Sequence, residues 1–119
     1  NAGMLAKVMQ EVGMDNCGTL PDFGNFCISN GDTGCVEQYD RYKGVRELMP
    51  FAKAVSAKSN NFDSQGYERD IDYVKMLQIV RDAGYSGFIG VEYEGSELDE
   101  AAGIKATRDL LLKASKQLS

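Results

Sequence analysis

Histidine is absent from the 119 residues of this chain. Without it the chain cannot supply a Ser-His or Cys-His nucleophilic pair, and it cannot build a histidine-based zinc site. Acid-base chemistry within the chain must therefore use Asp, Glu, Lys or Tyr side chains.

Apolar runs of the length needed to cross a bilayer are also missing, and no signal peptide is visible at Asn1. A hydrophobic share of 43% and a charged share of 26% are typical of a soluble globular protein. A length of 119 residues suits one domain with a single core. We therefore expect no membrane partner.

Lysines and arginines are scattered rather than clustered, and the formal net charge is -5. A nucleic-acid partner is not expected, because phosphate binding needs a concentrated positive face. Neither a Gly-x-Gly-x-x-Gly pattern nor a Gly-Lys-Ser/Thr pattern occurs, so nucleotide cofactors are not indicated. An acidic chain suits a cation better.

The three cysteines, Cys17, Cys27 and Cys35, lack Cys-x-x-Cys spacing, and an odd number cannot be fully paired within the chain. Free thiols in a reducing compartment are the default expectation, and they predict a cytoplasmic location. A Cys27 to Cys35 bridge across a loop is the alternative.

Hydrophobic periodicity predicts alternating helices and strands. Helices are expected over residues 2–12, 38–49 and 70–83 and from a capping box at Ser96 and Asp99 to residue 118; strands are expected over 17–20, 52–58 and 88–92. Such alternation predicts an α/β fold with a parallel sheet and right-handed crossovers.

The loops that follow the strands locate a site. Residues 23–37 and 59–69 are predicted to be long polar loops, whereas the connections from helix to strand are short. The elaborated side is therefore the carboxyl ends of the strands, where α/β proteins bind ligands.

Each predicted strand brings a charged side chain to that side: Asp22, Lys58 and Glu92. Strand alternation places Glu94 on the same face as Glu92. Hard cations such as Mg²⁺ and Mn²⁺ prefer oxygen ligands, so Asp22 and Glu92 are candidate metal ligands. The alternative is that their mutual repulsion makes one of them a general base. Asn25 and Glu94 are placed to contact substrate hydroxyls.

Three stretches carry a family resemblance: Gly18 to Asn25 (GTLPDFGN), Met49 to Lys58 (MPFAKAVSAK) and Ala83 to Gly95 (AGYSGFIGVEYEG). They resemble the sugar phosphate isomerase/epimerase family, the xylose isomerase-like TIM barrels. The resemblance implies the last three strands of a (β/α)8 barrel, with four helices. It also implies a divalent metal, Mn²⁺ or Mg²⁺ first and Zn²⁺ or Co²⁺ as alternatives, that assists proton transfer between adjacent sugar carbons.

Carried onto this chain, the resemblance makes Asp22 and Glu92 metal ligands and Glu92 also the acid-base group. Asn25, Ser56, Lys58 and Glu94 would contact the sugar or sugar phosphate. The chain departs from the family at Ser56, where a histidine ligand usually stands. A serine hydroxyl is a poor ligand, so the site either holds its metal with fewer protein groups or has lost it.

The resemblance also implies that residues 1–119 form one incomplete barrel unit, inactive alone. Three strands cannot close a barrel, so we expect the chain to associate with the missing N-terminal part or with another copy. Two alternatives to an enzyme fragment stay open. One is a non-catalytic sugar-binding or assembly module that kept the barrel, and the other, less well supported without histidines, is a DNA-repair endonuclease.

Overall fold

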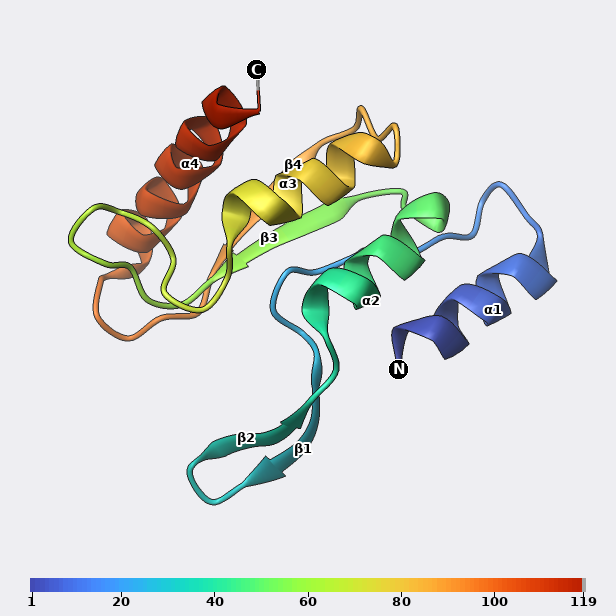
Figure 1. Cartoon of the computed structure of the whole chain (residues 1–119), viewed down its shortest axis with the longest axis horizontal. Helices are drawn as coiled ribbons and strands as arrows, with labels where there is room; N and C mark the ends of the chain where they lie inside the picture. The colour runs from blue at the N-terminus through green and yellow to red at the C-terminus, as the bar shows by residue number, and fades with distance from the viewer. Residues whose placement is uncertain (119) are drawn as a thin grey trace.

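A computed structural model of the chain describes residues 1–118, and Figure 1 shows the arrangement of its elements. The helices are α1 (Ala2–Val12), α2 (Arg41–Leu48), α3 (Tyr73–Asp82) and α4 (Glu100–Gln117), with a 3-10 turn, η1 (Met49–Phe51), after α2. The strands are β1 (Cys27–Gly31), β2 (Gly34–Gln38), β3 (Val55–Ser59) and β4 (Ile89–Tyr93). The chain therefore has the mixed α/β architecture that the sequence predicts.

The central sheet is parallel. β3 pairs with β4 in a register that sets Lys58 opposite Glu92. On the other side of β3, the amide of Ser56 donates to the carbonyl of Pro21 at 2.9 Å, and the amide of Phe23 donates to the carbonyl of Ser56 at 3.1 Å. The order across the sheet is thus the segment 19–23, then β3, then β4.

The predicted strand over residues 17–20 is wrong in its position. Pairing with β3 is limited to isolated bridges from Thr19 to Ala52 and from Asp22 to Ser56. Pro21, between the two bridges, has no amide hydrogen to donate, which interrupts the ladder. The paired segment runs from Thr19 to Asp22, so it starts later than predicted and includes the acid itself.

One face of this sheet is packed against α3 and α4. Val55 and Ala57 of β3 belong to the same buried apolar cluster as Met76 of α3 and Leu110 of α4. Burying such side chains is the main favourable contribution to folding. The helices therefore hold β3 and β4 in place from behind.

The opposite face of the sheet carries solvent-exposed apolar side chains. Leu20 is 60% exposed and Phe88 is 95% exposed. By strand alternation Leu20 shares the face of Asp22, and Phe88 shares that of Glu92. The face that bears the acids is thus the one that α3 and α4 leave uncovered.

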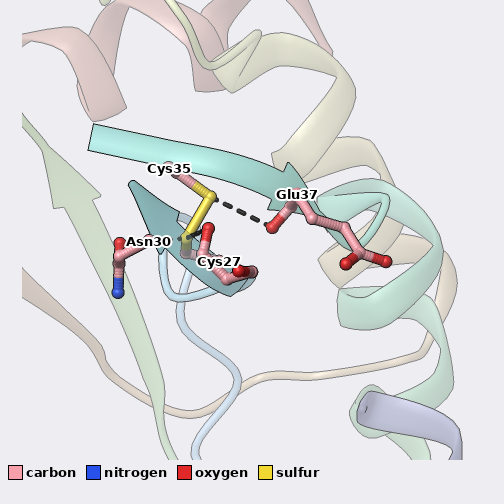
Figure 2. Close-up of a disulfide and its surroundings, with 5 residues drawn as sticks. Cys27, Asn30, Cys35 and Glu37 are labelled. Carbon is pink, nitrogen blue, oxygen red and sulfur yellow. Dashed lines mark hydrogen bonds between the residues drawn. A yellow bond between two sulfur atoms is a disulfide. The ribbon is translucent and has the colours of Figure 1, made fainter. Parts of the chain in front are cut away.

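Residues 23–37, predicted to be a loop, instead contain a β-hairpin, the arm formed by β1 and β2. Cys27 and Cys35 form a disulfide that joins the two strands, with a Cα–Cα distance of 5.8 Å (Figure 2). The expectation of free thiols is therefore wrong for this pair, while Cys17 is free and exposed. The disulfide does not support the expectation of a reducing compartment. The cytoplasmic location stays a prediction.

The arm projects from the rest of the chain, and all its strand residues are exposed (Figure 1). A two-stranded hairpin without a packed face is marginally stable in water. The disulfide supplies the constraint that a core would otherwise provide. The sequence predicts a loop here because it is polar and contains several glycines. The structure instead has two paired strands, joined by the Cys27 to Cys35 bridge that was the alternative expectation.

The predicted limits of α1 are confirmed, whereas α2, α3 and α4 start later than predicted. α2 and α3 begin after the N-caps Asp40 and Asp72. The predicted capping box at Ser96 is wrong: Asp99 itself caps α4 and accepts a hydrogen bond from the amide of Ala102 at 2.8 Å. An aspartate directly before the first helical residue satisfies a free amide, which explains each start. Over residues 1–118, none of the helices combines the length and the apolarity that a membrane span requires.

Reduction of the disulfide should loosen the arm and leave the sheet intact. We expect amides of residues 27–38 to exchange with deuterium faster after reduction, because a disulfide closing so short a loop is worth about 2–4 kcal/mol. Amides of α3 and α4 should keep their protection. Hydrogen exchange with mass spectrometry checks this, with Cys17→Ser as the control. Unchanged exchange over residues 27–38 would contradict it.

Candidate functional site

The ends of the three paired segments bring together the six side chains predicted from sequence. Asp22 is opposite Ser56, and Lys58 is opposite Glu92. Asn25 and Glu94, in the turns that follow Asp22 and Glu92, reach Lys58 from either side. The chemical roles of these residues stay predictions, but their convergence is a feature of the structure.

Glu92 is held by two neighbours on β3. The hydroxyl of Ser56 donates to Oε2 of Glu92 at 2.8 Å, and Nζ of Lys58 lies 3.2 Å from Oε1. The hydrogen bond from Ser56, followed by the interaction with Lys58, holds the pKa of Glu92 below its ordinary value. The carboxylate is therefore ionised at neutral pH.

Lys58 is the cation of the cluster, and its side chain is only 7% exposed. Its ammonium donates to Oδ1 of Asn25 at 2.8 Å and lies 3.0 Å from Oε2 of Glu94. With Glu92, these oxygens match the three donors of an ammonium group. Burial opposes the charge, but the Glu94 hydrogen bond and the charges of Asp22 and Glu92 outweigh it and raise the pKa of Lys58.

Asp22 uses one carboxylate oxygen for the backbone and leaves the other without a protein partner. Oδ1 accepts hydrogen bonds from the amides of Gly24 and Asn25, each at 2.8 Å. Oδ2 is buried and has no hydrogen-bond partner among the described residues. A buried acceptor in this state usually marks a place where water, an ion or a ligand belongs.

Two site features escaped the sequence reasoning. A Cβ atom at Gly24 would lie 2.8 Å from Cδ of Lys58, so only glycine lets the lysine pass across the turn. Tyr73, at the start of α3, donates its hydroxyl to the backbone carbonyl of Lys58 at 2.7 Å. The glycine after Asp22 is a detectable signal, whereas nothing in the pattern of α3 singles out Tyr73.

Asn25 also lines a hollow next to the cluster. A cavity of about 510 Å³ lies between α1 and the base of the arm, and its apolar lining includes Leu5, Phe26 and Ile28. Asn25 therefore connects the charged strand ends to this cavity.

Within residues 1–118, no group of three or more Asp, Glu, Cys or His side chains is placed to hold a metal ion. The acids that converge at the strand ends differ in what they contact. Glu94 is bound to Lys58, and Glu92 is bound to Ser56 and Lys58. Asp22 Oδ2 is the oxygen that remains available.

Comparison with known proteins identifies relatives. Residues 1–114 match the sequence profile of the family described as "Xylose isomerase-like TIM barrel". A protein of Mus musculus named "Putative hydroxypyruvate isomerase" is 29% identical over 90 residues, which cover 74% of this chain and 29% of that protein. The match thus spans less than a third of the length of that curated relative.

Removal of the Ser56 hydroxyl should raise the pKa of Glu92. The hydrogen bond from Ser56 is the largest cause of the lowered pKa, so Ser56→Ala should move it back toward the ordinary 4.5. A carboxyl ¹³C NMR titration measures this, with Ser29→Ala on the exposed arm as control.

The lowered pKa of Glu92 also makes the stability of the fold depend on pH. A lowered folded-state pKa stabilises the fold above the unfolded value, and this contribution disappears as the pH falls through the folded-state value. In Ser56→Ala we expect a smaller loss of stability on acidification below pH 4.5 than in the parent chain. An unchanged Glu92 titration in Ser56→Ala would contradict this account of the site.

Proposed function

Because the chain belongs to the xylose isomerase-like TIM barrel family, we propose that it forms the last three strands of a (β/α)8 barrel that isomerises or epimerises a sugar or sugar phosphate. The named mouse relative supports the isomerase class. The exposed face with Leu20 and Phe88 supports the partial barrel, because the remaining strands would cover it. In this proposal the chain alone is inactive.

The observation that carries the proposal is the unpartnered Oδ2 of Asp22 beside Glu92. A divalent cation prefers carboxylate oxygens, and Asp22 presents one that is buried and free of protein hydrogen bonds. Glu92 adds a second ionised carboxylate, whose oxygens have further lone pairs beyond those used by Ser56 and Lys58. These two residues fit part of a metal site, and the remaining ligands would come from water or from strands outside this chain.

The proposed reaction moves a proton between adjacent carbons of the sugar. A divalent cation held by Asp22 and Glu92 would supply positive charge that stabilises the negative charge developing on a sugar oxygen. In an isomerisation, Glu92 would accept the proton from the carbon next to the carbonyl and return it to the neighbouring carbon; an epimerisation, which returns the proton to the opposite face of the same carbon, would need a second acid on that face. The Ser56 hydroxyl and the Lys58 ammonium orient this carboxylate.

Substrate contacts would come from the rim of the cluster. Glu94 has a side chain that is 54% exposed, so it can exchange its bond with Lys58 for one with a sugar hydroxyl. Asn25, which lines the adjoining cavity, is the counterpart of Glu94 on the other side of Lys58. Lys58, once released by either partner, can donate to a sugar or phosphate oxygen.

Metal binding tests the proposal. We expect Asp22→Asn and Glu92→Gln each to weaken Mn²⁺ binding by more than roughly tenfold, because each removes a charged oxygen ligand. Electron paramagnetic resonance of free Mn²⁺ measures the affinity. Glu97→Gln is the matched control, since Glu97 also follows β4 but pairs with the exposed Arg69 at 2.8 Å. If all three variants bind Mn²⁺ as tightly as the parent chain does, the metal is removed from the proposal.

A second candidate is a sugar-binding or assembly module without metal chemistry. It is favoured by Lys58 and Ser56, which already bind both oxygens of Glu92. The variant Ser56→His distinguishes the two, because an added imidazole ligand should raise Mn²⁺ affinity if the site is otherwise intact. Unchanged metal affinity together with sugar binding that needs no metal, measured by calorimetry, would favour the module.

A further inference from the structure

The segment that carries Asp22 separates from β3 one residue after the acid, at Phe23. Ladder hydrogen bonds join the two as far as Phe23, whose amide donates to the carbonyl of Ser56 at 3.1 Å. The next amides, of Gly24 and Asn25, both donate to Oδ1 of Asp22. The sheet therefore opens into a fork at this point, with Asp22 on one branch and Lys58 on the other.

The fork leaves one carbonyl of β3 without a ladder partner. Along a parallel strand, successive residues bond to opposite neighbours. The carbonyl of Ser59 accepts from Glu94 on the β4 side at 2.9 Å, so the carbonyl of Lys58 faces the opened side. Leaving such a buried acceptor unpaired would be costly.

Tyr73 occupies that place. Its hydroxyl donates to the Lys58 carbonyl at 2.7 Å, and its ring meets the ring of Phe23 edge-on, with centroids 5.5 Å apart. The side chain is buried, and this burial raises the pKa of Tyr73, so the hydroxyl keeps its proton. One residue of α3 thus contacts both branches of the fork.

We propose that Tyr73 is a positioning residue that sets the separation of Asp22 and Lys58 by bridging the residues at the fork. Its hydroxyl fixes the backbone of Lys58, and its ring fixes the neighbour of Asp22. This role rests on the proposed function in so far as Asp22 and Lys58 serve the reaction. The bridge itself is independent of any metal or substrate.

The test compares two tyrosine-to-phenylalanine variants of the full 119-residue chain. Tyr73→Phe keeps the ring and removes the donor to Lys58. Tyr42→Phe is the matched control, because the hydroxyl of Tyr42 accepts from the amide of Asp72 at 2.9 Å at the same helix start but touches neither branch. Far-UV circular dichroism verifies that both variants fold.

The main readout is solvent exchange of the Lys58 ammonium protons, followed by ¹⁵N NMR. In the parent chain three acceptors hold these protons. Tyr73→Phe frees the backbone of Lys58, which should cost the ammonium about one of these hydrogen bonds, so we expect its protons to exchange about tenfold faster. Tyr42→Phe should match the parent chain. Unchanged exchange in Tyr73→Phe, or the same increase in both variants, would overturn the proposal.

Mn²⁺ affinity is the second readout. Lys58 orients the proposed ligand Glu92, so we expect Tyr73→Phe alone to weaken Mn²⁺ binding, by the about 10–100-fold that the loss of an outer-shell partner typically costs. The proposed metal site takes its remaining ligands from water or from strands outside this chain, so if the parent chain binds no Mn²⁺, the ammonium comparison alone decides the role of Tyr73. If circular dichroism shows that Tyr73→Phe has lost helix, Phe23→Leu replaces it. This variant removes the ring contact and keeps the Tyr73 hydroxyl, and we measure its ammonium exchange and its Mn²⁺ affinity in the same way.

Discussion

The buried ammonium of Lys58 is the constraint on which the strand ends depend. A charge taken out of water must be matched by hydrogen bonds and opposite charge, or folding becomes unfavourable. Asn25, Glu92 and Glu94 supply that match from two different segments. The turn after Asp22, the end of β3 and the end of β4 must therefore meet around one cation.

The two faces of the sheet divide the work of the molecule. The face toward α3 and α4 is apolar and fixes the strands through the buried cluster. The face with Asp22, Ser56 and Glu92 carries the polar chemistry beside open apolar positions such as Leu20. A family of barrels accounts for this division, because the interior of a barrel is where such a face points.

The sequence was most informative where a side chain's direction follows from strand parity. Glycines and β-branched residues mark β4, and the alternation along it predicts that Glu92 and Glu94 lie together, as they do at Lys58. The convergence of Asp22 and Ser56 required only that neighbouring strands be parallel.

The rest depended on interactions between distant residues. The Cys27 to Cys35 bridge was considered as an alternative, but the strands of the arm were not predicted, because they bury no apolar face and so show no alternating pattern. Tyr73 was missed for a related reason: a buried tyrosine in a helix predicts packing, and its hydroxyl partner lies on another element. Local sequence patterns predict which face of a strand a side chain lies on and where an element ends. Disulfides and the hydrogen-bond partners of backbone carbonyls depend on contacts between residues that are distant in sequence.

The base of the arm has a consequence for how such a protein can diversify. The amide of Tyr39 donates to the carbonyl of Phe26 at 2.8 Å, and the two rings stack, which closes the chain before the disulfide is reached. Insertions, deletions or whole exchanges beyond this clasp leave Asn25 and the strand ends where they are. The projecting part can therefore vary in length and sequence without changing the positions of the strand ends.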